Sequence, residues 1–116
     1  MAGKKKDHVG WIKLYRQVTD SSIWDIDDPY DKRSAWVYLL LSANHEDKDI
    51  VVKNSTITVH RGQRFTSVRK LSETFKWTKD KTLAFLRQLE RLGMVTRDAT
   101  HSGTLITIVK YEEYQG

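Results

Sequence analysis

The chain contains no cysteine and one proline, Pro29, and its longest run of apolar residues, 35–41, covers seven positions. The absence of cysteine excludes disulfide frameworks, thiolate metal ligands and cysteine nucleophiles. The apolar run is much shorter than the roughly 20 residues of a membrane-spanning helix. The lysines at positions 4–6 are followed by charged residues and no apolar segment, so no secretory signal is visible. We therefore expect a cytoplasmic protein.

The length and composition indicate one folded domain. The chain has 116 residues, of which 39% are hydrophobic, and it contains four tryptophans, five tyrosines and three phenylalanines. This aromatic content is atypical of a disordered chain, and the length suffices for one modest core. We expect a flexible basic N-terminus at residues 1–9, which is either a solubilising segment or a basic arm. A single domain at 10–116 follows it.

The positive charge is concentrated in one part of the chain. The net charge is +5, but residues 7–60 carry six basic and nine acidic residues, whereas residues 61–97 carry ten basic and three acidic ones. A moderate net charge is compatible with nucleic-acid binding or with solubility alone. Its concentration in 37 residues identifies that stretch as the candidate contact region.

The residue pattern predicts an α+β fold. Helical spacing of apolar residues occurs in 11–24, 31–43, 68–75 and 79–92, where Ser67 and Thr78 are suitable N-caps and Gly93 is a suitable terminator. β-branched runs predict one hairpin over 50–59 and a second from strands 94–97 and 104–109, joined by a loop of about six residues. Two helices joined by three residues and followed by a hairpin are typical of a winged helix-turn-helix. We expect such a fold, with three or four helices and two β-hairpins.

A helical wheel of residues 79–92 separates an apolar face from a basic face. At about 100° per residue, the inward positions are Thr82, Phe85, Leu86, Leu89 and Leu92. The second helix of this motif lies in the major groove, and a small residue on its outward face permits close approach. Arginine and lysine suit guanine or phosphate, and Gln88 suits adenine. The predicted groove-facing residues are Lys79, Lys81, Ala84, Arg87 and Gln88.

Further basic residues are candidates for phosphate contacts, although surface solubility explains them equally well. They are Arg69, Lys70, Lys76, Arg91 and Arg97. His101 lies in the loop of the second hairpin, which is either a wing that touches DNA or a plain polar loop.

Other side chains favour structural roles. Three of the four tryptophans have the helical spacing of core residues, and we expect Trp77, in the turn of the pair, to fill the space between the two helices. Asp25, Asp27, Asp28 and Asp31 lack the pattern of a calcium loop, so helix capping is favoured over metal binding. The four histidines are scattered, and no phosphate loop or catalytic triad motif is present. We expect no metal, no cofactor and no enzymatic activity.

Several short motifs follow one another over nearly the whole chain. They are Gly10-Trp11-Ile12-Lys13-Leu14-Tyr15-Arg16, Ile23-Trp24, Ala35-Trp36, Leu39-Leu40-Leu41-Ser42-Ala43-Asn44-His45, Arg61-Gly62-Gln63, Thr66-Ser67-Val68-Arg69-Lys70-Leu71, Trp77-Thr78-Lys79-Asp80-Lys81, Leu86-x-x-Leu89-Glu90-x-x-Gly93-Met94 and Tyr111-x-x-Tyr114-Gln115. In this order and spacing they resemble the N-terminal domain of phage replisome organisers, the DnaD-like replication initiation proteins of phages and prophages of Gram-positive bacteria.

The resemblance implies a winged helix that binds double-stranded DNA at a phage origin and supports recruitment of the bacterial replicative helicase or its loader. It also implies self-association. Family members usually continue beyond the Tyr-x-x-Tyr-Gln segment into a partner-binding region, so we expect an excised domain or a short relative. Two alternatives stay open: a protein-interaction winged helix without strong DNA binding, and a transcriptional regulator.

Overall fold

The computed structural model describes residues 13–24 and 26–115. The basic N-terminus predicted at 1–9, as well as Trp11 and Asp25, lies outside these residues. Within them, no helix has both the length and the apolar character needed to cross a membrane.

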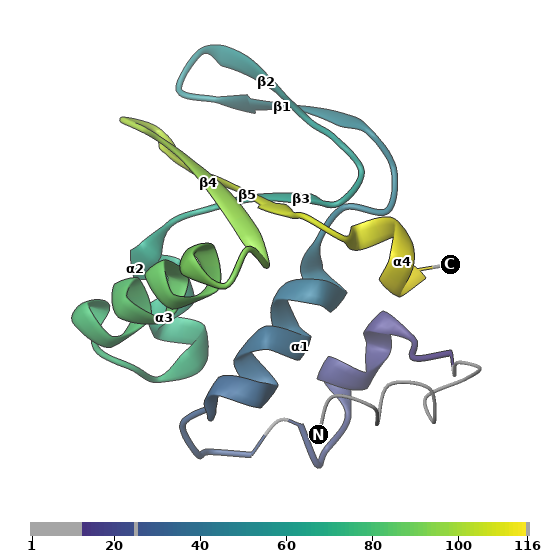
Figure 1. The fold of residues 1–116 in the computed structure, drawn as a ribbon, viewed down its shortest axis with the longest axis vertical. Helices are drawn as coiled ribbons and strands as arrows, with labels where there is room; N and C mark the ends of the chain where they lie inside the picture. The colour runs from purple at the N-terminus through teal and green to yellow at the C-terminus, as the bar shows by residue number, and fades with distance from the viewer. Residues whose placement is uncertain (1–12, 25, 116) are drawn as a thin grey trace.

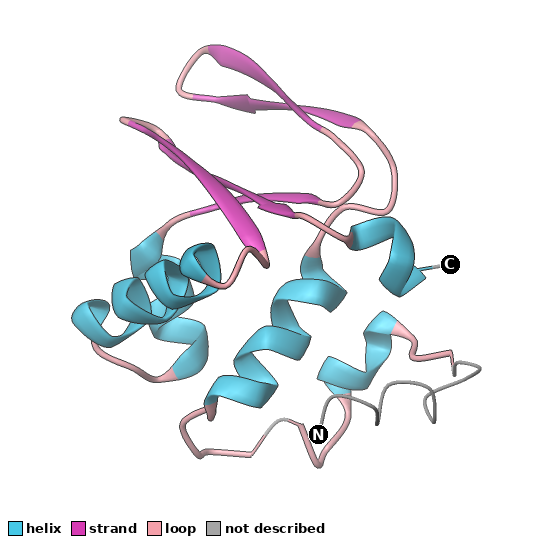
Figure 2. Cartoon of the chain, viewed as in Figure 1, coloured by secondary structure: helices cyan, strands magenta, loops and turns pink. Residues whose placement is uncertain are grey.

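The architecture is α+β, with helices packed beside two small antiparallel sheets (Figures 1 and 2). One sheet is the hairpin β1–β2, and the other has three strands in the order β3-β5-β4. In chain order the elements are the 3-10 helix η2 (Arg16–Asp20), α1 (Lys32–Ser42), β1 (Lys48–Val52), β2 (Ser55–Val59), β3 (Gln63–Thr66), α2 (Val68–Phe75), α3 (Lys79–Arg91), β4 (Val95–Thr100), β5 (Gly103–Ile108) and α4 (Tyr111–Gln115).

The helix pair α2–α3 forms at the predicted positions because its ends are capped by local side chains. Ser67 Oγ accepts a hydrogen bond from the Lys70 amide, and Thr78 Oγ1 accepts one from the Lys81 amide. Lys76 takes a left-handed conformation with φ of 59°, which ends α2. Only three residues therefore separate the two helices, as predicted.

A buried hydroxyl pair joins the two helices. Ser72 Oγ of α2 donates to Thr82 Oγ1 of α3 over 3.0 Å, and Thr82 Oγ1 donates to the Thr78 carbonyl oxygen. Both side chains are buried, so the pairing satisfies groups that would otherwise be costly to desolvate. The contact sets how α3 crosses α2.

The core lies between the helices and the three-stranded sheet. Phe75 is fully buried, and the rings of Tyr30, Tyr38, Trp77 and Phe85 surround it at centroid distances of 5.2, 5.7, 4.9 and 6.3 Å. The central strand β5 alternates in burial as a half-buried strand does. The buried residues on that strand are Thr104, Ile106 and Ile108.

The second hairpin differs from the prediction of a six-residue loop. Strands β4 and β5 pair as far as Thr100 opposite Gly103, which leaves a two-residue turn at His101 and Ser102. Thr100 Oγ1 accepts from the amides of Ser102 and Gly103, which closes the tip. The strand ends were missed because Asp98 and Ala99 are exposed and give no apolar alternation.

Four other predictions need correction. Helix η2 covers only five residues of the predicted 11–24 segment, and residue 63, which was predicted to lie in a break, begins strand β3. Helix α4 was not predicted because it is short and polar. Leu92, which was predicted to face the core, is 63% exposed because it caps the end of α3.

Helix α4 rests against Gly62, which connects β2 to β3. Gly62 has a φ of 85°, and a Cβ atom at this position would lie 2.9 Å from the Tyr111 Cβ. Arg61 reinforces the contact through two hydrogen bonds to Glu112, of 2.7 and 3.1 Å, and this pairing lowers the pKa of Glu112. The C-terminal helix therefore depends on the absence of a side chain at position 62.

We expect Gly62→Ala to destabilise the domain by about 1–3 kcal/mol more than Gly93→Ala. Both glycines have positive φ, so both substitutions incur the left-handed strain of about 1–2 kcal/mol, but a Cβ at Gly93 meets nothing within 4 Å. Urea unfolding of the two variants measures the difference. Equal losses would contradict the close packing of α4 on Gly62.

Candidate nucleic-acid interface

Helix α3 presents a basic face to solvent. Thr82, Phe85, Leu86 and Leu89 are buried on one side, as the helical wheel predicted, with Leu92 the exception. Arg91 continues the outward face towards the end of the helix, and Gln88 is half-buried at its margin. The exposed residues on this side in the first three turns are Lys79, Asp80, Lys81, Ala84 and Arg87. The face therefore has a small residue at its centre with cations on either side, and one acidic residue, Asp80, in its first turn.

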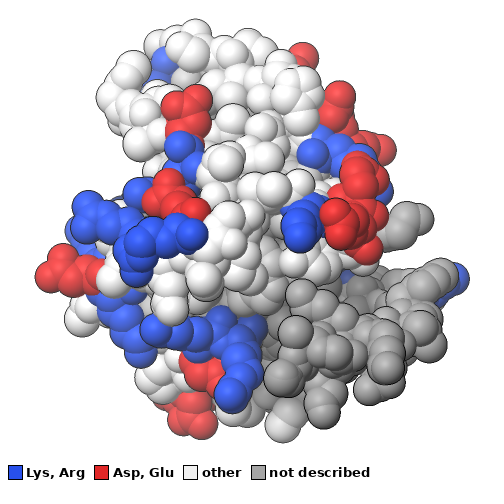
Figure 3. Space-filling model, viewed as in Figure 1, with Lys and Arg blue, Asp and Glu red and all other residues white. Residues whose placement is uncertain are grey.

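The basic surface extends beyond α3. Figure 3 shows lysine and arginine side chains gathered over the region of α2 and α3 and continuing towards the start of α1, with smaller acidic patches beside them. The exposed Lys32, at the start of α1, belongs to this surface, since its Nζ donates to Gln88 Oε1 of α3 over 3.0 Å. It comes from the part of the chain that is acidic overall, so the sequence analysis did not select it. No periodicity or motif in the sequence signals that α1 begins beside α3.

The cations of this surface differ in their pairing. Lys70, Lys79, Lys81, Arg87 and Arg91 form no salt bridge with any carboxylate in the described part of the chain. Arg69 pairs with Glu73 at 3.1 Å, and Lys76 pairs with Asp27 at 3.6 Å. Both pairs are exposed, and exposed pairs are weak. A phosphate can therefore replace either carboxylate at little cost.

Arg97 is less suited to a phosphate contact than the sequence analysis expected. Its side chain is 18% exposed and pairs with Glu90 of α3 over 3.0 Å. Its Nε atom is buried and has no hydrogen-bond partner among the described residues. The pair attaches β4 to α3, so we assign Arg97 to the support of the basic face.

Trp77 holds the start of α3 in place. Its ring packs on Phe75 and Phe85, and its Nε1 donates to the Tyr30 carbonyl oxygen over 2.7 Å. The prediction that Trp77 fills the space between the helices is confirmed, since it is only 8% exposed. Lys81 Nζ lies 4.6 Å from the centre of this ring, which is a cation–π distance. The lysine is thereby positioned while it stays exposed.

The tip of the β4–β5 hairpin carries His101 in an exposed position. The fixed two-residue turn makes this hairpin a compact projection instead of the looser loop that was predicted. Near its tip, the neighbouring charged residue Asp98 is exposed and acidic. His101 is therefore accessible, but the hairpin adds little net positive charge.

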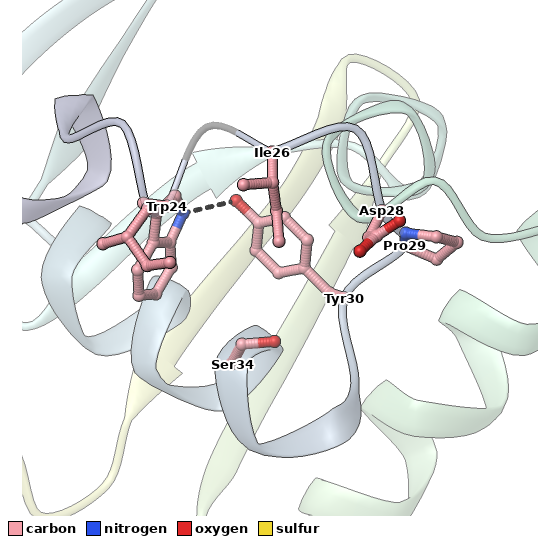
Figure 4. A pocket seen from close by; sticks show the side chains of 7 residues that line it. Trp24, Ile26, Asp28, Pro29, Tyr30 and Ser34 are labelled. Atoms are coloured by element: carbon pink, nitrogen blue, oxygen red, sulfur yellow. Dashed lines mark hydrogen bonds between the residues drawn. The ribbon is translucent and has the colours of Figure 1, made fainter.

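Two small pockets among the described residues lie apart from the basic face. The first, of about 140 Å³, is lined by Trp24, Ile26, Tyr30 and neighbouring residues, and the Trp24 Nε1 donates to the Tyr30 hydroxyl across it (Figure 4). The second, of about 240 Å³, lies beside α4. Both are smaller than the roughly 300–1,000 Å³ of small-molecule sites. The basic face is thus the candidate site.

Asp31 caps the helix that contributes Lys32. Its Oδ1 accepts from the Ser34 amide over 2.8 Å, and Ser34 Oγ accepts from the Asp31 amide, which completes a capping box. The pKa of the Asp31 carboxyl group is lowered most by the hydrogen bond it accepts from the Ser34 amide, and next by the one it accepts from the Ser34 hydroxyl. The capping role favoured for this aspartate is confirmed.

The capping of α1 should weaken at low pH. Folding lowers the pKa of Asp31, so the stabilisation by its carboxylate is complete above the unfolded-state pKa of about 4. This stabilisation is lost as the pH falls through the lower pKa of the folded state. Asparagine caps equally well and does not titrate. Between pH 6 and pH 2.5, we expect the melting temperature of the wild type to fall more steeply than that of Asp31→Asn. Parallel curves would show that the capping bond does not depend on the charge.

Comparison with known proteins returned no match: no protein-family model fits the chain, and neither a curated protein nor a solved structure is significantly similar to it.

Proposed function

We propose that this chain is a winged-helix domain that binds double-stranded DNA through α3, as part of a cytoplasmic replication initiation protein of the phage replisome-organiser type. The observation that carries the proposal is the unpaired basic face of α3 around Ala84. In a helix-turn-helix, this is the face that enters the major groove. Origin recognition and helicase recruitment rest on the family resemblance alone.

The arrangement around α3 supports the proposal. A helix that enters a groove must project from the body and be held rigidly. Helix α3 is held by the Ser72–Thr82 bond, by Trp77 at its start and by the Arg97–Glu90 pair near its end. The β4–β5 hairpin follows α3 directly in the chain, as a wing does in a winged helix-turn-helix. Lys70 and Arg69 on α2 are the candidates for phosphate contacts at the edge of the groove.

The charge distribution favours one orientation on DNA. Five cations on α2 and α3, Lys70, Lys79, Lys81, Arg87 and Arg91, form no salt bridge among the described residues, whereas the loop before α1 carries the exposed Asp27, which pairs with Lys76, and the exposed Asp28. A phosphate backbone is attracted to the first surface and repelled by the second. The domain should therefore bind with α3 towards the DNA, and the net charge of +5 understates the potential at that face.

Neutralising Lys81 and Arg87 together should weaken DNA binding and reduce its salt dependence. Each phosphate contact contributes about 0.9 to the slope of log K against log salt, so the loss of two contacts makes the slope shallower by about 1.8 and lowers affinity at 0.1 M salt by roughly 10- to 100-fold. Fluorescence anisotropy with a labelled duplex, titrated at several salt concentrations, measures both quantities for Lys81→Gln/Arg87→Gln.

The matched control is Lys48→Gln/Lys53→Gln, which removes the same charge from the β1–β2 hairpin. We expect this variant to lose much less affinity, since only long-range attraction is affected. If both double variants lose affinity equally, or if neither does, α3 is not the contact surface. Comparison of the phage origin with promoter sequences then separates replication from transcriptional regulation.

A second candidate function, self-association, is favoured by the β1–β2 hairpin. The hairpin projects from the body (Figure 1), and Val51 on its edge strand is 76% exposed. An exposed strand edge can pair with another chain. Sedimentation velocity should then show an oligomer for the wild type and a monomer for Val51→Lys. An oligomer without DNA affinity at low salt would favour a protein-interaction role, and a monomer at all concentrations would exclude this use of the hairpin.

A further inference from the structure

A contact between α1 and α3 changes what the outward face can recognise. Lys32, the first residue of α1, donates from Nζ to the Gln88 Oε1 over 3.0 Å, although the two residues are 56 positions apart in the chain. Lys32 is exposed, and the structure shows no salt bridge between it and any described carboxylate. The nearby acid, Asp31, is occupied by its capping bonds to Ser34. Lys32 therefore belongs to the same surface as α3.

The chemistry of the two groups fixes the orientation of the glutamine amide. An ammonium group only donates hydrogen bonds, whereas a carboxamide has a donor end and an acceptor end. Lys32 must therefore face the oxygen of Gln88, and the Nε2 group is directed away from the lysine. The remaining N–H groups of Lys32 and the two of Gln88 Nε2 then form a cluster of donors.

This cluster suits acceptors better than it suits adenine, because the Gln88 oxygen that adenine would need as an acceptor is already shared with Lys32. Adenine in the major groove offers one acceptor and one donor, so a glutamine that reads it must use both ends of its amide. Guanine offers two acceptors, N7 and O6, and phosphate offers acceptors only. Gln88 lies one helical turn after the exposed Ala84, on a helix face that leaves room for close approach to base edges. The position favours a base edge over the backbone.

We infer that Lys32 and Gln88 act as a joined donor pair that reads the N7 and O6 atoms of a guanine in the major groove. The inference rests on the proposed DNA binding by α3 and replaces the sequence-based expectation that Gln88 reads adenine. Lys32 has two functions in this arrangement. It orients the Gln88 amide, and it supplies a donor of its own from α1.

The test is selection from a randomised duplex library by the wild type and by Lys32→Met, followed by affinity measurements on the selected site and on its single-base variants. For the wild type we expect one guanine whose replacement by adenine costs roughly tenfold in affinity, as a lost bidentate contact does. In Lys32→Met the amide is released, so this preference should disappear or shift to adenine. Arg33→Met is the matched control because it removes a charge from the same helical turn, and it should keep the guanine preference.

The outcomes separate the two proposals. If the wild type does not bind duplex DNA, the proposed function fails and this inference fails with it. If the wild type binds DNA and Lys32→Met lowers affinity equally for all sequences, with a salt slope shallower by about 0.9, Lys32 contacts phosphate and the base-reading inference is overturned. If Lys32→Met binds all sequences as the wild type does, Lys32 takes no part. Thermal unfolding of each variant verifies that the fold is retained.

Discussion

The arrangement of the helices depends on the aromatic cluster around Phe75. Its ring is fully buried between the rings of Tyr30, Tyr38, Trp77 and Phe85, which come from the loop before α1, from α1, from the helix connection and from α3. Two hydrogen bonds to backbone oxygens reinforce the cluster, one from the Tyr30 amide to the Phe75 carbonyl oxygen and one from the Trp77 side-chain Nε1 to the Tyr30 carbonyl oxygen. One cluster thus sets the positions of three helices at once. This is also why Lys32, which lies two helical turns before the buried Leu39 of α1, reaches Gln88.

Much of the fold was predictable because its signals are local. Helices α2 and α3 begin after Ser67 and Thr78, whose side chains cap the following amides, and they end at a left-handed Lys76 and just before Gly93. Such signals need only a few neighbouring residues. Strand β3 gave no comparable signal, since its residues, Gln63 to Thr66, owe their conformation to pairing with β5, some 40 residues later.

The same distinction applies to the candidate site. The helical wheel identified the exposed face of α3 because amphipathicity is a property of one helix. It could not identify partners from elsewhere, such as Glu90 for Arg97 or Lys32 for Gln88. Glu90 and Arg97 are seven residues apart across the turn at Gly93, so their pairing depends on how the chain reverses there. The first contact removes Arg97 from the predicted phosphate-contact residues, and the second adds Lys32 to the exposed basic face.

Rigid support for α3 has a consequence for recognition. A side chain that is oriented before binding loses less conformational freedom on contact than a mobile one, and the saving appears as affinity and discrimination. On this face, Lys81 lies over Trp77 and Gln88 is bonded to Lys32, so both are oriented by neighbours on other segments. Arg87 has no such partner among the described residues and keeps the freedom that suits a phosphate contact. Under the proposed function, Gln88 as an oriented group suits a base edge, whereas Arg87 as a freer cation suits the phosphate backbone.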